Sequence, residues 1–376
     1  MKKERIARIH DLLGLVNTLY PPALAEEWDN AGLQAGDTGA ELNRVLLCLD
    51  PSGQALDAAR EAGAQAILTH HPLIFHPLKN LTPGDETGRI LFRAVREGVA
   101  VLCAHTNLDR AAPGLNDWLA ERLGLSEISP LAADRGGDLL KLVVFVPRGY
   151  EEAVADALFK GGAGKLGNYD RCSFAATGIG TFRPGTGTEP FLGRQGETER
   201  AGEIRLETIL PREAQGKVVE KMLRAHPYEE VAYDLIPLAN RRPHVGLGRI
   251  GRLAQPATLS DFAEEVKSAL GAGSLRLVGD LARTVAKVAV CGGSGASLLG
   301  EAARQGADVL VTGDLKYHDA RSAEGRGMAL IDAGHFATER LMIQGMAAAL
   351  REETERRGLN IEFIEMVGEE DPFKTI

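Results

Sequence analysis

The sequence has 376 residues, of which 44% are apolar and 25% are charged, as in a globular protein of two or three domains. Its formal net charge of −9 disfavours a general nucleic-acid binder, because phosphate binding needs clustered Lys and Arg. No apolar run approaches the ~20 residues of a membrane span, and residues 1–5 lead into an amphipathic segment rather than a signal peptide. Four cysteines without a CxxC pair indicate a reducing compartment. We therefore expect a soluble cytoplasmic protein without a membrane partner.

The first part of the chain alternates between helix and strand patterns. Apolar residues at helical spacing predict a helix at 6–19, which Pro21 and Pro22 end. The strands expected after it span 44–49, 65–69 and 99–104, and the helices span 52–62, 90–97 and 115–123. Ser52 can cap the first of these helices, and Gly63 can end it. The alternation predicts an α/β domain with a mostly parallel sheet.

The pattern changes at about Leu139. Strands are expected at 140–146, 172–177, 203–210 and 231–237, and helices at 151–160 and 212–225. The order strand, helix, strand, strand, helix, strand is the ferredoxin-like plan. We therefore predict an inserted ferredoxin-like module at 131–240.

The last part of the chain repeats the first. Cys48 precedes Thr69 by 21 positions, and Cys291 precedes Thr312 by the same number. The strand at 99–104 likewise matches the strand that begins at Met328, and a histidine follows each. Several matches in the same order indicate an internal repeat. The sequence thus predicts an α/β fold of two similar halves, at 1–130 and 241–376, interrupted by the inserted module.

Candidate metal ligands follow equivalent strands in the two halves. They are His70, His71, His105 and Asp109 in the first half, and His335 and Glu339 in the second. Ligand sites in open α/β sheets lie beyond the carboxyl ends of the strands, and a site between two repeats would collect groups from both. Imidazole and carboxylate together suit Zn, Fe, Mn or Co. More than four such ligands favour two ions at roughly 3.5–4 Å over one tetrahedral ion.

Each of these motifs has a simpler explanation when taken alone. The pair His70 and His71 could be an ordinary surface turn, and Glu339 in a first helical turn needs no metal to explain it. In the second half, the segment 312–316, which contains Asp314 and Lys316, occupies the place of Thr69, His70 and His71. Asp314 and Lys316 could hold a substrate or orient water, and a solvated turn explains them equally well. The amides of the glycine-rich segment 292–295 could bind an anion.

Five segments together resemble a known family, the Nif-three-like dinuclear-metal proteins, which are also labelled GTP cyclohydrolase type-2-like. The segments are 27–34 (EWDNAGLQ), 68–75 (LTHHPLIF), 105–109 (HTNLD), 312–318 (TGDLKYH) and 334–339 (GHFATE). Together they cover both halves of the chain in order. The middle module is similar to the PII/CutA-like insertion of longer members.

The resemblance implies a homohexameric ring with metal sites facing its cavity, and two divalent metal ions in each chain. The metal ligands that it implies are His70, His71, Asp109, His335 and Glu339. Glu339 would bridge the two ions, and His105 would lie near them without being a ligand.

Two functions are consistent with these residues. The first is a metal-dependent hydrolase that acts on a nucleotide or phosphoester, in which His105, Asp314 or Lys316 moves protons or holds the substrate. The alternative is a non-catalytic metal-binding ring that senses a ligand or partner through the inserted module. A DNA-associated ring is a weaker third possibility, because the composition is acidic. The cyclohydrolase label is a family name and does not by itself indicate the reaction.

Overall fold

The structure is a computed structural model that describes residues 6–133 and 138–374. Residues 1–5, on which the expected absence of a signal peptide depends, lie outside the described residues. The chain divides into two compact units, one formed by 1–133 with 243–376 and the other by 134–242. Within the described ranges, no helix has both the length and the apolar character needed to span a membrane.

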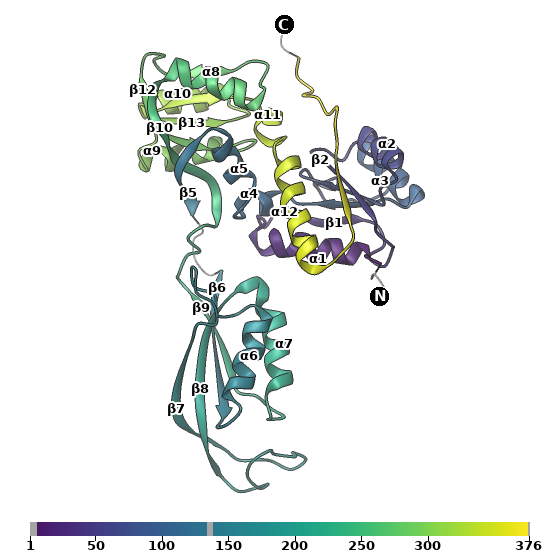
Figure 1. The fold of residues 1–376 in the computed structure, drawn as a ribbon, viewed down its shortest axis with the longest axis vertical. Coiled ribbons are helices and arrows are strands. Elements are labelled where there is room, and N and C mark those ends of the chain that lie inside the picture. Colours follow the sequence, from purple (N-terminus) through teal and green to yellow (C-terminus); the bar gives the residue numbers. More distant parts are fainter. Residues whose placement is uncertain (1–5, 134–137, 375–376) are drawn as a thin grey trace. The chain divides into compact units, whose positions relative to one another are not determined.

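The first unit contains two sheets (Figure 1). One has the strand order β1-β4-β3-β2-β15, and the other has the order β11-β14-β13-β12-β10-β5. The strands of the first sheet are β1 (Gly32–Ala35), β2 (Arg44–Cys48), β3 (Ala66–Thr69), β4 (Ala100–Cys103) and β15 (Glu362–Glu365). Those of the second are β5 (Leu125–Ala133), β10 (Gly246–Thr258), β11 (Arg276–Val278), β12 (Thr284–Val290), β13 (Val309–Thr312) and β14 (Ala329–Asp332).

The two sheets share a repeated centre. Strands β2, β3 and β4 run parallel to one another, and so do β12, β13 and β14. An antiparallel strand then lies beside the third of each set, β1 next to β4 and β11 next to β14. The expected α/β fold with two similar halves is confirmed.

Each half also receives a strand from the other end of the unit. Strand β15, near the C-terminus, pairs in parallel with β2, whereas β5 from the first half pairs with β10 in the second sheet. One apolar core runs through both halves and includes Leu12, Leu119, Val288 and Leu350. The two halves therefore form one body, which can hold side chains from both in a single site.

Helix α2 (Gly53–Ala62) of the first unit begins and ends at the residue types expected of it. The Ser52 hydroxyl accepts a hydrogen bond from the Ala55 amide at 3.1 Å, and Gly63 ends the helix in the left-handed conformation. The helices are α1 (Ile9–Leu19), α2 (Gly53–Ala62), α3 (Glu86–Glu97), α4 (Thr106–Arg110), α5 (Leu115–Arg122), α8 (Leu259–Leu270), α9 (Leu299–Arg304), α10 (Tyr317–Gly325), α11 (His335–Glu339) and α12 (Met342–Arg357). Short 3₁₀ turns η1 (Pro22–Leu24) and η3 (Ala296–Leu298) accompany them.

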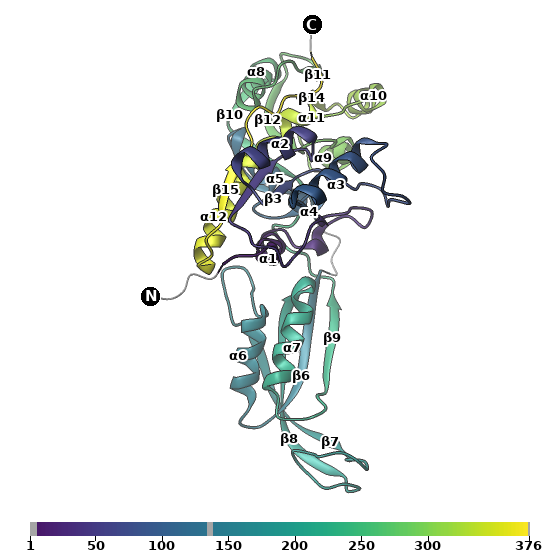
Figure 2. The same ribbon diagram turned by 90° about the vertical axis from the view of Figure 1, so that its right-hand side faces the viewer.

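The second unit is a four-stranded antiparallel sheet with the order β7-β8-β6-β9 (Figure 2). Its elements are β6 (Leu139–Pro147), α6 (Glu151–Gly161), β7 (Ser173–Phe182), β8 (Glu199–Pro211), η2 (Arg212–Ala214), α7 (Gln215–Ala225) and β9 (Tyr233–Leu238). Alternate residues of β6 pack with both helices in a separate core, which includes Leu142, Val154 and Met222. This element order is the ferredoxin-like plan.

Candidate metal centre

The polar side chains of the site follow the carboxyl ends of parallel strands. His70 and His71 come directly after β3, and His105 comes soon after β4, at the start of α4. In the second half, β14 is followed by α11, which carries His335 and Glu339. Because parallel strands end at the same edge of a sheet, the topology brings these side chains together.

The carboxylate of Glu339 lies at the centre of the cluster. Its Oε2 is 3.0 Å from Nε2 of His71 and 2.9 Å from Nε2 of His335, and these two nitrogens are 3.2 Å apart. Its other oxygen, Oε1, lies 3.6 Å from Nε2 of His70. The same His70 nitrogen is 3.6 Å from Oδ1 of Asp109. The two oxygens of Glu339 thus face two different sets of potential metal ligands. His71 and His335 lie near Oε2, and His70, with Asp109 beside it, lies near Oε1.

A second group holds each of these imidazoles from behind through Nδ1. Nδ1 of His70 lies 2.9 Å from the carbonyl oxygen of Ala104. Nδ1 of His71 is 2.8 Å from Asp50 Oδ1, and Nδ1 of His335 is 2.7 Å from Asp314 Oδ2. An acceptor behind Nδ1 fixes a proton there and turns the Nε2 lone pair toward the cluster, as in metal-binding histidines.

Two buried atoms of the cluster lack a hydrogen bond within the described residues, Nε2 of His70 and Oδ1 of Asp109. Their separation of 3.6 Å is too long for a good hydrogen bond. Two ligands that are each about 2.1 Å from one ion, at a tetrahedral angle, lie about 3.4 Å apart. The donor types and their spacing therefore fit a bound divalent cation.

The pKa shifts of the cluster show that Glu339 attracts positive charge. Burial opposes the charged form of His71, but hydrogen bonds with Asp50 and Glu339 outweigh it and raise its pKa to about 10. The hydrogen bond with Glu339 raises the pKa of His335 to about 9, whereas burial raises the pKa of Asp109 to about 6. Burial disfavours ionised Glu339, yet the surrounding imidazoles hold its pKa well below the usual range. Glu339 is therefore an ionised carboxylate that attracts positive charge.

His105 lies at the edge of the cluster, and Asp29 holds it there. Its Nδ1 is 2.9 Å from Asp29 Oδ1, and the other Asp29 oxygen accepts hydrogen bonds from the amide and hydroxyl of Thr106. The ring of His105 is 5.2 Å from that of His70. His70, His71 and His105 have ligand atoms within 4.8 Å of one another, so His105 can reach a metal ion bound by its neighbours.

Asp314 and Lys316, the two candidates from the second half, differ in their position. Asp314 contacts His335, and its φ of 55° lies in the left-handed region, which costs a residue other than glycine of order 1 kcal/mol. Lys316 is exposed, and its amide donates to Asp319. In the described part of the chain, Lys316 makes no hydrogen bond or ion pair with the cluster.

The glycine-rich segment 292–295 binds side chains of the protein itself. The amide of Gly292 donates to Asn116, the amide of Gly293 to Thr338 and the amide of Gly295 to Thr312. These amides are not available to an external anion. The expectation of an anion site here is not supported, because side-chain oxygens from neighbouring elements occupy three of the four amides.

Two residues of the site were not predicted from the sequence. Asp50 follows β2 and accepts from His71, and Asp29 accepts from His105. Asp29 lies inside one of the five family segments. The segment therefore pointed to this residue, but the sequence did not indicate what it does. The signal for Asp50 was weaker, because a carboxylate after a strand is also common in solvated turns.

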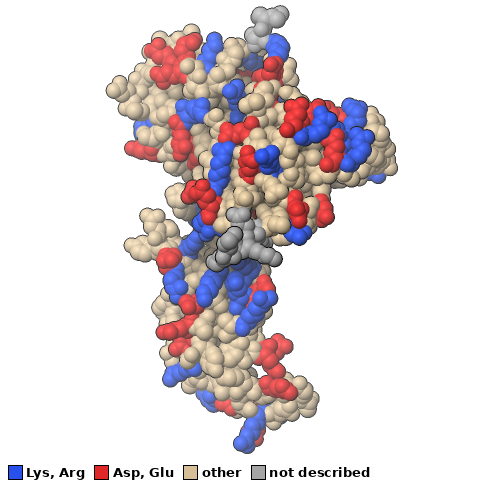
Figure 3. Space-filling view, turned by 45° about the vertical axis from the view of Figure 1, so that its right-hand side comes forward, with Lys and Arg blue, Asp and Glu red and all other residues tan. Residues whose placement is uncertain are grey.

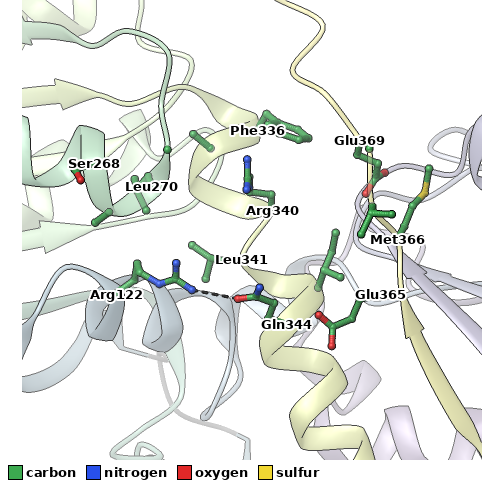
Figure 4. A pocket seen from close by; sticks show the side chains of 16 residues that line it. Arg122, Ser268, Leu270, Phe336, Arg340, Leu341, Gln344, Glu365, Met366 and Glu369 are labelled. Carbon is green, nitrogen blue, oxygen red and sulfur yellow. Dashed lines mark hydrogen bonds between the residues drawn. The ribbon is translucent and has the colours of Figure 1, made fainter.

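Two cavities in this unit share Phe336 and Glu369 as lining residues. One, of about 480 Å³, is lined by Arg122, Arg340 and Gln344 among others, and Arg122 donates to Gln344 (Figure 4). The other, of about 430 Å³, is lined by His71, Asp50 and Phe336 among others. The second cavity contacts the cluster directly through His71.

A family model described as Duf34/NIF3 (NGG1p interacting factor 3) matches residues 7–372. The chain belongs to the Duf34/NIF3 family. A NIF3 family relative from Halalkalibacterium halodurans, named "GTP cyclohydrolase 1 type 2 homolog", is 41% identical over 99% of this chain and 100% of its own. A relative of the same name from Bacillus subtilis is 42% identical over 90% of this chain and 91% of its own.

Solved structures show the same family relationship. A Bacillus cereus protein described as related to NIF3 has a TM-score of 0.89 and 42% identity, and the match covers 99% of this chain and 100% of that one. Staphylococcus aureus protein SA1388 has a TM-score of 0.77 and 30% identity, with 99% of both chains covered. The expected resemblance to NIF3-like proteins is confirmed.

Proposed function

We propose that this NIF3 family chain is a dinuclear metal-dependent hydrolase. The position of Glu339 carries the proposal, because its two oxygens face separate donor sets. His71 and His335 with Oε2 would hold one ion, and His70 and Asp109 with Oε1 would hold the other. Zn, Fe, Mn and Co all suit imidazole with carboxylate.

Divalent ions bound there would supply Lewis-acid polarisation of the scissile group and lower the pKa of a water molecule. The chain supplies the proton carrier. His105 keeps Nδ1 on Asp29, which leaves its Nε2 free to accept or donate a proton. Asp314 acts by orienting His335 rather than on the substrate. No contact assigns a role to Lys316.

The surroundings favour a nucleotide over a simple phosphoester. Trp28 and Phe75 are 59% and 48% exposed, and their ring centroids are 5.7 Å apart. Trp28 also lies 6.0 Å from the ring of His105. Exposed aromatic faces beside a catalytic centre offer a stacking surface for a flat base.

The test is a hydrolysis screen of metal-loaded protein against nucleotides and phosphoesters. We expect His105→Ala to keep its metal content and to lower kcat by about 10²- to 10⁴-fold, as for loss of a proton carrier. Trp28→Ala should raise KM for the nucleotide substrate and not for a phosphoester without a base. Fully loaded protein that hydrolyses none of these substrates would contradict the proposal.

A second candidate is a non-catalytic metal-binding protein that senses a ligand through the second unit. The separate core and separate cavity of that unit favour it.

The resemblance supports a homohexameric ring, which sedimentation of the full chain would test. Free cysteines, three of them buried, support a reducing, cytoplasmic location.

The third possibility, binding to DNA, has little support. On the face that Figure 3 shows, acidic and basic side chains are interspersed over the first unit. Phosphate backbones are bound by clustered basic side chains.

A further inference from the structure

The second unit contains a cavity of about 440 Å³. Its lining residues come from β6, the end of β7, the loop after β7, β8 and the loop before β9. All of them lie in the second unit, so the cavity is separate from the metal cluster. The proposed hydrolase does not use it.

Aromatic rings form much of the lining. Tyr228 lies 6.0 Å from Phe182 and 6.0 Å from Phe191, measured between ring centroids. Phe145 also lines the cavity. Such a group of rings offers negatively polarised faces, and these attract a cation that comes within about 6 Å.

A buried carboxylate lies against the same cavity. The Glu203 side chain belongs to a residue that is only 7% exposed. Its Oε1 accepts a hydrogen bond from the Tyr228 hydroxyl at 3.1 Å. Among the described residues, nothing donates to its Oε2 and no Lys, Arg or His forms an ion pair with it. Oε2 is therefore available to pair with a cation that enters the cavity, in a charge-assisted hydrogen bond.

The neighbouring strand leaves room for this carboxylate. Glu203 on β8 pairs with Gly178 on β7, and the next residue of β7 on that face is Gly180. A methyl group at Gly180 would overlap with Oε2 of Glu203. The absence of a side chain at Gly180 therefore allows the carboxylate to lie where it does.

The remaining charges of the lining are mostly negative. Glu229 and Glu230 line the cavity together with Glu203, and Arg183 is the one basic side chain among the lining residues that the structure describes. Arg183 donates through Nε to the carbonyl of Gly196. Both oxygens of Glu229 lie 3.2 Å from the Glu189 amide and accept from it. An anionic ligand would be repelled here.

We propose that this cavity binds a small organic cation, an ammonium group on an aromatic or aliphatic body. The ammonium group would pair with Oε2 of Glu203, and the body would pack against Tyr228, Phe182 and Phe191.

The test is a calorimetric titration of the full chain with three probes that differ in charge. They are 2-phenylethylamine, a cation at neutral pH, neutral 2-phenylethanol and anionic phenylacetate. We expect saturable binding of the amine at one per chain, about tenfold or more weaker binding of the alcohol, and none of the acid. Equal binding of all three, or binding of none, would overturn the proposal.

Two variants and one control test whether the amine binds at this cavity. Glu203→Gln keeps the acceptor for Tyr228 and should weaken amine binding about tenfold, since it removes the charge alone. Gly180→Ala should displace the carboxylate and weaken binding similarly. Glu207→Gln is the matched control on the same strand, because Glu207 pairs with Lys141 outside the cavity, and it should bind as the wild type does.

Each outcome decides the matter. Unchanged binding in Glu203→Gln would contradict the proposal. Since the readout needs neither metal nor turnover, the result is independent of the proposed hydrolase activity.

Discussion

At the scale of single residues, the cluster separates into two donor sets joined by Glu339. Adjacent histidines at one turn would point in different directions in a strand, but His70 and His71 lie beyond the end of β3. Each is held by its own acceptor, Ala104 or Asp50, and each meets a different oxygen of Glu339. The two histidines therefore serve separate ions in the proposed centre.

Substitution of single ligands should distinguish the two ions. His71→Ala should remove one metal ion per chain, because His71 belongs to one donor set only. Glu339→Ala should weaken both, because its carboxylate is common to both sets. Elemental analysis of dialysed protein measures this, with His76→Ala, an exposed histidine outside the cluster, as the control. Equal losses in the two ligand variants would contradict the bridging role.

Asp29 should make the stability of the first unit sensitive to acid. Burial opposes its ionisation, but hydrogen bonds from His105 and Thr106 outweigh burial and lower its pKa to about 2. A lowered pKa adds stability above the unfolded pKa of about 4, and that stability is lost as the pH falls toward 2. The ionised carboxylate should contribute about 2 kcal/mol at neutral pH.

Urea unfolding of wild type and Asp29→Asn at about pH 6 and about pH 3 tests this. The difference in unfolding free energy between the two proteins should shrink by about 1 kcal/mol at the lower pH. An equal difference in unfolding free energy at both pH values would show that Asp29 is not held in its ionised form.

At the scale of elements, the loops after the strands set the position of the ligands. The segment 292–295, after β12, packs against α11. Gly293 has a φ of 59°, and a methyl group there would overlap with Oε1 of Glu339. The absence of a side chain at Gly293 therefore leaves the space that the Glu339 carboxylate occupies.

We therefore expect Gly293→Ala to reduce metal affinity by about 10- to 100-fold, the size of effect seen when groups behind a ligand are altered. It should also cost of order 1 kcal/mol through backbone strain. Gly300→Ala is the control, because a methyl group at Gly300 meets open space in a helix. Competition with a chromophoric chelator measures the affinity, and wild-type affinity in Gly293→Ala would contradict this account.

Local sequence patterns predicted most elements and the cluster of candidate ligands at the strand ends. Strand β3, the Ser52 cap and the helix before Gly63 follow from apolar patterning and from cap residues. The pairing of β15 with β2 and of β5 with β10 did not follow, because neither strand carries a mark of its distant partner. Asp50 was missed for the same reason: it becomes a histidine acceptor only after β2 and β3 pair.

At the scale of the whole molecule, the chain leaves the first unit and returns to it at neighbouring positions. Ala133 at the end of β5 pairs with Gly246 at the start of β10. The core of the first unit contains no residue of the second. The first unit should therefore fold without the second.

Replacing residues 134–242 with a short Gly-Ser linker tests the role of the second unit. The shortened chain should keep its full metal content, because all proposed ligands lie in the first unit. If the second unit senses a ligand, turnover should persist and binding of 2-phenylethylamine should vanish. Lost turnover with intact metal content would instead assign the second unit a part in catalysis.

The central claim is that each chain holds two metal ions at Glu339. The most direct measurement is an elemental count on protein never exposed to a chelator, combined with anomalous scattering from crystals of that protein. We predict two ions per chain, with peaks on either side of the Glu339 carboxylate, one near His71 and His335 and the other near His70 and Asp109. A count near zero, or peaks elsewhere, would contradict the account.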